Sequence, residues 1–342
     1  MIIPVNLAQD SYEILLEDNA LANINQAINV KRKILLVTDD GIPKQYVDKV
    51  MQQCDPVFLA IVKQGEASKS FAEYKSLLKL LVKNQFTRSD AIIALGGGVV
   101  GDLAGFVAAS YMRGIDFYNI PTTLLAQVDS SVGGKTAIDF CNLKNIVGAF
   151  HQPKKVIIDP LVLETLSRRE TNAGLVEAIK MAATSDANLF DLIKNNPLKE
   201  NIKQIIADSL AIKIDIVQND VKEKNLRKVL NFGHTVGHAI EVQSNYLHGE
   251  CIGMGMLYFC SDQVRTKLIE ILKQFNLPLK SNLSVDKIFS AILHDKKTSG
   301  DEITIVYVPE IGSYQLIDLT LDECKAKLEE SQQKIASLLQ NI

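Results

Sequence analysis

Cysteine is scarce in this chain of 342 residues, and its pattern excludes two kinds of protein. The five cysteines are odd in number and form no Cys-x2-Cys pair, which argues against a disulfide framework and against a thiolate zinc site. A run of about 18 uncharged apolar residues is also missing, so we expect no membrane-spanning helix. The formal net charge of −3 offers no general basic field, and we therefore expect neither nucleic acid nor a membrane surface as a partner.

The amino-terminal residues also lack the features of a secretory signal. Residues 1–5 have neither the charged segment nor the long apolar segment of such a signal, so we expect a cytoplasmic protein. What is present is an ordinary globular composition, 47% hydrophobic and 23% charged. Because 342 residues exceed what one hydrophobic core usually organises, we expect two domains.

Short apolar runs alternate with helical patterns in the first half of the chain. The runs expected to be buried strands are residues 33–37, 57–62, 91–95, 117–120 and 156–158. Helical patterns lie between them, notably at residues 43–52 and 69–83. This alternation predicts a parallel βαβ sheet with helices on both faces.

The pattern changes beyond about residue 160. Long amphipathic segments follow at residues 172–185, 199–218, 223–244 and 250–274, and a late strand-like pair lies at residues 303–308 and 314–317. No low-complexity linker or internal repeat is seen. We therefore predict an α/β parallel-sheet domain at residues 1–158, suited to a nucleotide, and a mainly α-helical domain at residues 159–342.

Histidine is concentrated in one short region. Asn231-Phe-Gly-His-Thr-Val-Gly-His238 and Leu247-His-Gly-Glu250 together hold three of the five histidines. In a helix, His234 and His238 share a face, and His248 could approach that face from a following element. A catalytic zinc typically takes three protein ligands, often two histidines and a carboxylate. The pattern favours a metal site, and ordinary core or surface histidines are the alternative.

Two glycine-containing segments could meet phosphate. Gly96-Gly-Gly-Val-Val-Gly101 follows a strand and opens a helix, so its amides could face phosphate oxygens, although a tight turn is the simpler reading. Ile120-Pro121 replaces the acidic residue of the standard dinucleotide motif, so a dinucleotide would bind differently. Asp129-Ser-Ser-Val-Gly-Gly-Lys-Thr136 ends like a phosphate loop, but Asp129 stands where a glycine is needed. We reject an ATPase and keep Lys135 as a possible phosphate-binding cation.

Seven motifs together carry a family resemblance. They are Gly65-Glu-Ala-Ser-Lys69, Leu95-Gly-Gly-Gly-Val-Val-Gly-Asp102, Pro121-Thr-Thr-Leu-Leu-Ala-Gln-Val-Asp-Ser-Ser-Val-Gly-Gly-Lys-Thr136, Lys144-Asn145, Gly174-Leu-Val-Glu-Ala-Ile-Lys180, Asn231-Phe-Gly-His-Thr-Val-Gly-His238 and Leu247-His-Gly-Glu250. In order and spacing they resemble 3-dehydroquinate synthase, from about residue 60 to Asp295-Lys-Lys297. Jointly these motifs are highly specific.

The resemblance implies an activity and its cofactors. The family converts 3-deoxy-D-arabino-heptulosonate 7-phosphate into 3-dehydroquinate and phosphate, in the shikimate pathway of aromatic amino acid biosynthesis. It uses bound NAD and one divalent metal, zinc or cobalt, and is cytoplasmic and usually a homodimer. Transient oxidation, β-elimination of phosphate, re-reduction, ring opening and intramolecular aldol closure are the implied steps.

The resemblance also implies roles for individual residues. The implied metal ligands are Glu177, His234 and His248. The implied NAD contacts are Gly65, Glu66, Lys69, Gly98, Val99, Val100, Gly101, Asp102, Thr122, Thr123, Lys135, Lys144, Val162, Leu163, Glu164 and Thr165. The implied catalytic and substrate contacts are Arg113, Asp129, Lys135, Asn145, Lys180, Lys213, Arg227, Asn231, His238, Lys296 and Lys297. Helical spacing by itself leaves open that both His234 and His238 bind the metal.

Some positions depart from the family pattern. Leu143 and Asp139 replace a common Gly and Asn, and Val221 and Asn225 interrupt an acidic motif, which affects local loop shape rather than a ligand or charged contact.

Glycerol and alcohol dehydrogenases resemble this architecture, but a neutral polyol would not need so many cations. A non-catalytic binding module would be expected to have lost a ligand or a lysine, and none is missing.

Overall fold

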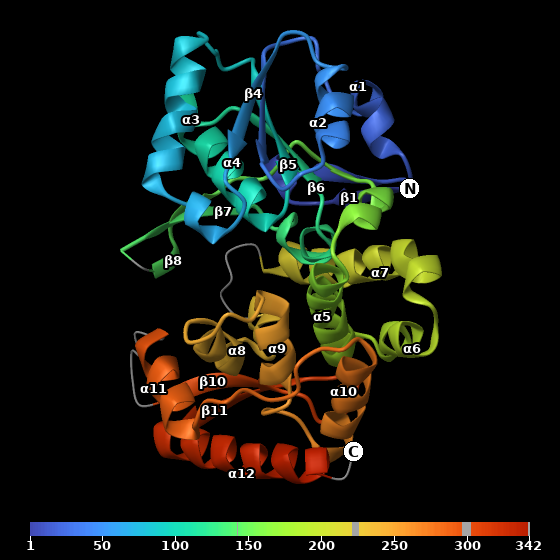
Figure 1. Cartoon of the computed structure of the whole chain (residues 1–342), viewed down its shortest axis with the longest axis vertical. Coiled ribbons are helices and arrows are strands. Elements are labelled where there is room, and N and C mark those ends of the chain that lie inside the picture. Colours follow the sequence, from blue (N-terminus) through green and yellow to red (C-terminus); the bar gives the residue numbers. More distant parts are fainter. Residues whose placement is uncertain (142, 221–225, 296–301, 341–342) are drawn as a thin grey trace. The chain divides into compact units, whose positions relative to one another are not determined.

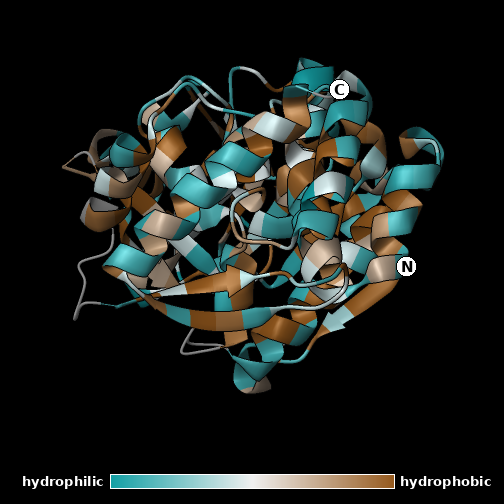
Figure 2. Ribbon diagram, turned by 90° about the horizontal axis from the view of Figure 1, so that it is seen from below, coloured by the Kyte–Doolittle hydropathy of each residue, from teal (hydrophilic) through white to brown (hydrophobic). Residues whose placement is uncertain are grey.

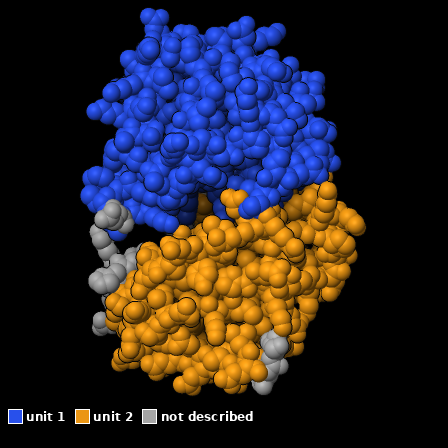
Figure 3. Space-filling view, in the orientation of Figure 1, with its two compact units in different colours: residues 1–167 blue, residues 168–342 orange. Residues whose placement is uncertain are grey.

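The computed structural model divides the chain into two units, Met1–Ser167 and Arg168–Ile342 (Figure 3), here called the N-terminal and C-terminal units. It describes residues 1–141, 143–220, 226–295 and 302–340. The expected fold class is confirmed, since the N-terminal unit contains a mostly parallel sheet and the C-terminal unit is mainly helical.

The sheet of the N-terminal unit has seven strands in the order β1-β2-β9-β6-β5-β3-β4. Their bounds are β1 Ile2–Val5, β2 Tyr12–Leu16, β3 Ile34–Asp39, β4 Val57–Val62, β5 Ala91–Gly96, β6 Asp116–Pro121 and β9 Lys155–Ile158. All five expected strands are present, and their pairings are parallel, as expected. Strands β1 and β2 were not expected; they pair with each other antiparallel, and β2 also pairs parallel with β9.

Helices cover both faces of this sheet, because its central strands are apolar on both sides. Ile34 and Leu36 of β3 belong to one buried cluster with helices α1 (Ile24–Ala27) and α2 (Lys44–Met51). Leu35 and Val37 belong to a second cluster with α3 (Phe71–Lys83) and α4 (Gly98–Ser110). Successive side chains of a strand point to opposite faces, which explains this division. Figure 1 shows the two helix pairs on opposite sides of the sheet.

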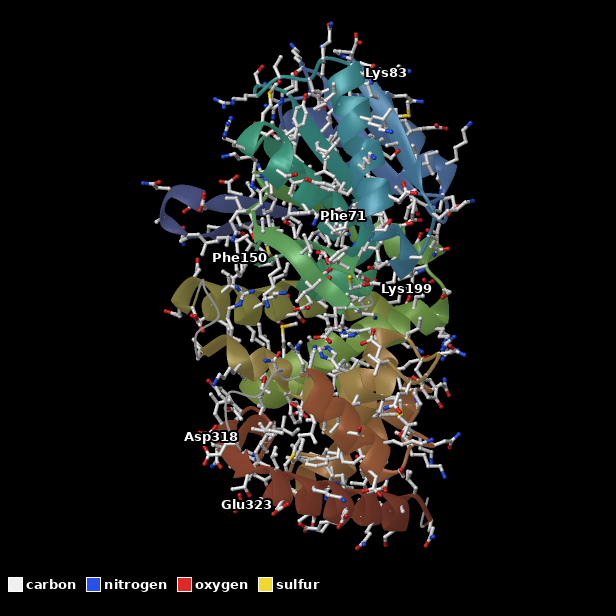
Figure 4. The ribbon with its side chains drawn as sticks, turned by 90° about the vertical axis from the view of Figure 1, so that its left-hand side faces the viewer. Phe71, Lys83, Phe150, Lys199, Asp318 and Glu323 are labelled. Atoms are coloured by element: carbon white, nitrogen blue, oxygen red, sulfur yellow. The ribbon has the colours of Figure 1, made fainter. Side chains whose placement is uncertain are left out.

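A two-stranded antiparallel hairpin lies outside the main sheet and was not predicted. It consists of β7 (Lys135–Phe140) and β8 (Leu143–Phe150), and its first strand packs against α4. Gly105 of α4 allows the close approach, since a Cβ there would lie 2.5 Å from Thr136 Cγ2. Figure 4 labels Phe150, at the end of β8, and Phe71, at the start of α3; both side chains are exposed.

The N-terminal unit extends past its last strand, to residue 167 rather than to the expected residue 158. The short helix η6 (Pro160–Thr165) follows β9, and its Val162 side chain lies in the buried cluster of α1 and α2. Asp159, which is 4% exposed, caps η6 and binds the backbone of residues far away in sequence. Its carboxylate accepts hydrogen bonds from the N–H groups of Asn19, Leu21 and Leu161. These contacts attach the segment to the sheet unit.

Helices build most of the C-terminal unit. Their bounds are α5 Arg168–Ser185, α6 Ala187–Asn195, α7 Leu198–Asn219, α8 His234–Glu241, α9 His248–Met256, α10 Asp262–Gln274, α11 Val285–Asp295 and α12 Leu321–Gln340. Figure 2 shows hydrophobic and hydrophilic residues alternating along the helices, as amphipathic segments require. The expected late hairpin is present as β10 (Glu302–Tyr307) and β11 (Gln315–Thr320). Within the described residues, no helix is long and apolar enough to cross a membrane.

Two expected helical segments are broken in the structure. Of the segment 223–244, the described part forms a short helix η7 (Leu226–Asn231), a turn and then α8, so the expectation of one continuous amphipathic segment is wrong there. Gly233 makes the turn with a φ of 78°, where a Cβ would lie 2.8 Å from Ile252 O. Segment 250–274 is likewise divided into α9 and α10, and Ser261 caps the second helix by accepting from Val264 N.

Replacing Asp159 with alanine tests whether this carboxylate attaches η6 to the sheet. The change leaves the buried Leu21 N–H without its acceptor, so we expect the free energy of unfolding to fall by about 2–4 kcal/mol. Denaturant unfolding of Asp159→Ala and of the exposed control Asp48→Ala measures this. We expect the control to change stability by less than about 0.5 kcal/mol, and an equal loss in both variants would contradict the assignment.

Candidate active site

Three histidines meet where α8 and α9 begin. His234 is the first residue of α8, His238 lies one turn later, and His248 is the first residue of α9. Helices α8 and α9 pack against each other, and one ring nitrogen from each histidine lies within 4.8 Å of the others. The expectation that His234 and His238 share a helix face near His248 is therefore met by the geometry.

A buried carboxylate from α5 joins this cluster. Glu177 is 1% exposed, and its Oε1 lies 3.8 Å from His234 Nε2 and 3.6 Å from His248 Nε2. Lys180, one turn along α5, places Nζ 2.5 Å from Oε2. Among the described residues, neither carboxylate oxygen has a hydrogen-bond partner of good geometry. A buried acceptor of this kind requires a cation, and Lys180 supplies it on one side only.

Hydrogen bonds determine which nitrogen of each ring faces Glu177. His234 Nδ1 lies 3.2 Å from Phe232 O, and a carbonyl can only accept, so Nδ1 carries the proton. His248 Nδ1 lies 3.0 Å from Glu241 Oε2, so the same argument applies to a carboxylate acceptor. In the neutral form of each ring, Nε2 is thereby the atom that has a free electron pair on the side of Glu177. This is the arrangement that metal-binding histidines adopt.

The electrostatics of the cluster keep the Glu177 carboxylate ionised and the His234 ring neutral. Burial opposes ionisation of Glu177, but Lys180, His248 and His234 lower its pKa well below the ordinary value. Burial, with Lys180, lowers the pKa of His234 well below its ordinary value, so this ring is neutral. Burial opposes protonation of His248, yet the nearby carboxylates of Glu177 and Glu241 raise its pKa to about 9. A metal ion at Nε2 would take the place of that proton.

Two donor sets are compatible with these positions. One set consists of the three histidines. The other replaces His238 with Glu177, whose Oε1 is 3.6 Å and 3.8 Å from the two Nε2 atoms. Donors about 2.1 Å from a tetrahedral zinc stand about 3.4 Å apart, close to these separations. The residues present therefore fit a divalent ion, and the second set is the one that the family resemblance implies.

Two further cations, Lys213 and Arg227, lie buried in the same unit as Lys180. Lys180, Lys213 and Arg227 are 2%, 5% and 2% exposed and come from α5, α7 and η7. These three elements pack against one another, so the structure brings the three predicted substrate residues onto adjoining elements. Asn231, at the end of η7, is exposed. Lys296 and Lys297 lie outside the described residues.

In the N-terminal unit, the predicted nucleotide contacts gather at the start of α4. The helix begins at Gly98, and a Cβ there would lie 3.1 Å from Ser130 Oγ. Thr122 Oγ1 and Ser130 Oγ are buried without a hydrogen-bond partner among the described residues. A helix amino terminus, glycine backbone and available hydroxyl groups fit the phosphates of a dinucleotide. Asp129 belongs to the short π-helix Ala126–Ser130 beside them.

Lys69 connects the predicted nucleotide segment with the β7–β8 hairpin. It is 4% exposed, and its Nζ lies 2.8 Å from Asp102 Oδ2 and 3.5 Å from Glu66 Oε1 and also donates to Asn145 Oδ1. Asn145 has a φ of 56°, and its N–H donates to Asp139 Oδ1 at 2.8 Å. Burial opposes the charge, but Asp102 and Glu66 raise the pKa of Lys69. Four predicted site residues are therefore joined through one ammonium group.

The remaining predicted residues are more dispersed. Lys135 and Lys144 are exposed on the hairpin, and Glu164 and Thr165 are exposed on η6. Val162 has its side chain in the core, so only its backbone can reach a ligand. Arg113 follows the carboxyl end of α4, about 20 Å from the glycines at the other end, since a helix rises about 1.5 Å per residue. The structure does not bring Arg113 together with them.

Comparison with known proteins identifies the family. A model of the 3-dehydroquinate synthase N-terminal region matches residues 59–173, and a model of the C-terminal region matches residues 174–298. The chain is 40% identical to a curated 3-dehydroquinate synthase from Streptococcus thermophilus, covering 96% of this chain and 100% of that protein. The chain belongs to the 3-dehydroquinate synthase family. A relative from Latilactobacillus sakei, also 40% identical, covers 96% and 98% of the two chains.

Solved structures show the same fold at lower identity. A 2-deoxy-scyllo-inosose synthase, solved with carbaglucose-6-phosphate, NAD+ and Co2+, superposes with a TM-score of 0.85 at 23% identity, covering 96% of this chain and 100% of that one. A 2-epi-5-epi-valiolone synthase from Streptomyces hygroscopicus, with NAD+ and Zn2+ bound, gives 0.85 at 24%, covering 95% and 97%. A probable glycerol dehydrogenase from Sinorhizobium meliloti gives 0.64 at 13%, covering 95% and 97%. The expected enzyme class, 3-dehydroquinate synthase, is confirmed by the family membership.

Several residues beside the site of this 3-dehydroquinate synthase family member were not predicted from its sequence. Glu241, which bonds His248, and the pair of Arg169 with Glu250 were not selected. Ser130, beside the start of α4, was also passed over. Glu250 stood in a quoted motif, His-Gly-Glu, and could have been found by asking what its carboxylate contacts. Nothing in the local pattern pointed to Arg169.

Replacing Lys69 with methionine tests its connection to the hairpin. The variant keeps the length of the side chain but removes the donor to Asn145 and the charge beside Asp102. Charged hydrogen bonds are worth about 1.5–3 kcal/mol, so we expect hydrogen exchange of residues 143–147 to speed up by about 10- to 100-fold. The exposed pair of Lys63 with Asp40 supplies the control, Lys63→Met, which should leave the hairpin unchanged. Unaltered exchange in Lys69→Met would exclude the connection.

Proposed function

We propose that this chain converts 3-deoxy-D-arabino-heptulosonate 7-phosphate into 3-dehydroquinate and phosphate, with NAD and one divalent metal ion. The observation that carries this proposal is the arrangement of Glu177, His234 and His248, with two Nε2 atoms directed at one buried carboxylate. Family membership supports the reaction, and the bound NAD+ and Co2+ or Zn2+ of two proteins with the same fold support the cofactors.

The metal assignment follows from the donor chemistry. Imidazole nitrogen and carboxylate oxygen suit zinc, and cobalt accepts the same set. Glu177, His234 and His248 would hold the ion, while His238 remains beside them, with its ring centre 5.1 Å from that of His234. His238 is thereby placed to hold a substrate oxygen or move a proton.

The N-terminal unit would bind NAD and the C-terminal unit the metal and most of the substrate. The start of α4, with Thr122 and Thr123 after β6, supplies backbone N–H groups and hydroxyl groups for phosphates. Lys69 and Asp102 form an ion pair, and this pair would help to position the start of α4 for NAD. Residues of η6 would contribute through exposed polar atoms and backbone. We also propose that the chain acts as a homodimer, as the family usually does.

The substrate carries a carboxylate and a phosphate, and the buried cations suit two anionic ends. Lys180, Lys213 and Arg227 are buried cations, and an anion bound beside them would form charge-assisted hydrogen bonds. Arg227 can bind an anion with two parallel bonds, whereas each lysine acts as a point charge. Lys135, Asn145 and Asn231 would add polar contacts. Holding both ends of the substrate keeps its reacting carbon atoms oriented.

The cofactors supply what the side chains cannot. When bound, NAD would accept and return a hydride, and the divalent ion would polarise the hydroxyl groups of the substrate. The residues of the chain orient the substrate, neutralise its charges and move protons. Lys180 has a second effect, because its charge beside Glu177 keeps that carboxylate ionised.

A simple dehydrogenase is the rival function, because a probable glycerol dehydrogenase shares the fold. The two reactions differ in what happens to NAD. The proposed reaction returns the hydride in each cycle, whereas a dehydrogenase releases NADH. The buried cations favour the anionic substrate over a neutral polyol.

Catalytic use of NAD therefore tests the proposed reaction. With the heptulosonate phosphate and less than one equivalent of NAD, we expect many molecules of phosphate released per NAD and no lasting increase in NADH absorbance. The assay combines phosphate detection with continuous absorbance. NADH accumulating in proportion to product would identify a dehydrogenase instead.

Metal content separates the two donor sets. We expect purified His234→Ala to contain far less than one metal ion per chain, because it removes a ligand. His238→Ala should keep nearly one ion while turnover is strongly reduced, because it removes a pocket group. Elemental analysis of both variants, after equal exposure to zinc, makes the comparison. Equal loss of metal would show that His238 is a ligand and that the assignment of Glu177 is wrong.

A further inference from the structure

We propose that Glu241, together with the ion pair of Arg169 and Glu250, positions His248 for metal binding. Resting on the metal site of the proposed function, this inference assigns roles to three residues that bind neither the ion nor the substrate. Glu241 orients the imidazole ring, and the Arg169–Glu250 pair holds the helix start that carries it. Each role follows from a separate set of contacts in the C-terminal unit.

The first set of contacts surrounds Glu250. Arg169 binds it with two parallel hydrogen bonds, Nε to Oε1 and Nη2 to Oε2, both 2.7 Å long. Oε2 also accepts from Leu247 N at 2.8 Å, so the same carboxylate caps the amino terminus of α9. With both oxygens engaged and the side chain only 8% exposed, Glu250 has no role as a ligand. His248 is the first residue of the helix that it caps.

This pair joins two of the three helices that carry the proposed ligands. Arg169 lies in the first turn of α5, which carries Glu177, whereas Glu250 lies in the first turn of α9, which carries His248. The helices touch at Gly249, where a Cβ would lie 1.9 Å from Ala173 O. At such a contact, sliding of one helix would change the distance between Glu177 Oε1 and His248 Nε2, now 3.6 Å. A bidentate pair resists sliding because both bonds require one geometry.

The second set of contacts surrounds Glu241, at the end of α8. Its Oε2 lies 3.0 Å from His248 Nδ1, and the side chain is 15% exposed. His248 itself is 33% exposed, so packing alone leaves its ring partly free to turn. The bond to Nδ1 selects the tautomer and the ring orientation that direct Nε2 at Glu177. His234 needs no such side chain, because the backbone oxygen of Phe232 performs this task.

Loss of the Arg169–Glu250 pair should affect metal affinity more than it affects folding stability. The Arg169 side chain is 59% exposed, although that of Glu250 is only 8% exposed, so solvent screens the pair on one side. Its removal should therefore lower stability without unfolding the chain. The ligand geometry, in contrast, depends on small displacements. Loss of residues that orient ligands typically lowers metal affinity by about 10- to 100-fold.

The experiment measures metal release from the full-length, metal-loaded protein. Glu241→Ala, Glu241→Gln and Arg169→Ala are loaded with zinc, and transfer of the ion to a chromogenic chelator is followed in time. We expect Glu241→Ala and Arg169→Ala to release zinc about 10- to 100-fold faster than the unaltered chain. Glu241→Gln should recover most of the loss, because its amide oxygen still accepts from Nδ1–H. Cobalt-loaded samples should show an altered visible spectrum in the two alanine variants only.

A matched control removes an ion pair elsewhere in the same unit. Lys194 and Glu270 connect α6 with α10 at 2.6 Å, and Lys194→Met removes that pair without touching α5, α8 or α9. We expect its zinc release to match that of the unaltered chain. Equal release from Arg169→Ala, Glu241→Ala and the control would overturn the positioning role. If the unaltered chain itself bound no zinc, the metal site of the proposed function would fail instead.

Discussion

Burial of one carboxylate, that of Glu177, constrains the structure around the site. An ionised group that is 1% exposed must be matched by positive charge or by donors, because its hydration is lost. Lys180 meets one oxygen from the same helix, and the two Nε2 atoms of His234 and His248 face the other. Keeping these groups at a single point requires that α5, α8 and α9 be in contact at fixed positions along their axes. The divalent ion proposed above would bind to these same donors.

Glycine makes that contact possible, because three helices can meet closely only where side chains are missing. A Cβ on Gly255 would lie 2.0 Å from Gly233 O, and one on Gly249 would lie 1.9 Å from Ala173 O. The glycines are thus spaced along α9 so that one faces the turn before α8 and another faces α5. Where the backbones approach this closely, small shifts of one helix change the separation of the ligands. This sensitivity gives the exposed Arg169 and the half-buried His248 an importance that exposure alone would not suggest.

In the N-terminal unit, the polar groups of the predicted site lie at the edge of an apolar sheet. Its central strands are buried on both faces, and polar residues of the predicted nucleotide site lie after strand ends, at the start of α4 and on the hairpin. Lys69 joins three of these places because it reaches Asp102 and Glu66 and also donates to Asn145. A buried lysine with several acceptors holds those acceptors together and is not a freely mobile cation. Its charge is stabilised by the acidic groups that it holds together.

The sequence by itself determined the strands β3, β4, β5, β6 and β9, most helices of the C-terminal unit and the family, because apolar periodicity and motifs are local properties of the chain. It did not reveal β1, β2 or the β7–β8 hairpin, whose strands are short or exposed and lack a clear apolar run. The sequence also predicted one amphipathic segment over residues 223–244, because the break at Gly233 depends on close packing against α9. The pairing of Glu177 with His234 and His248 depends on tertiary structure, and the sequence indicated it only through the family resemblance. Arg169 and Glu250 are 81 residues apart, and no local pattern records that two helix starts lie side by side.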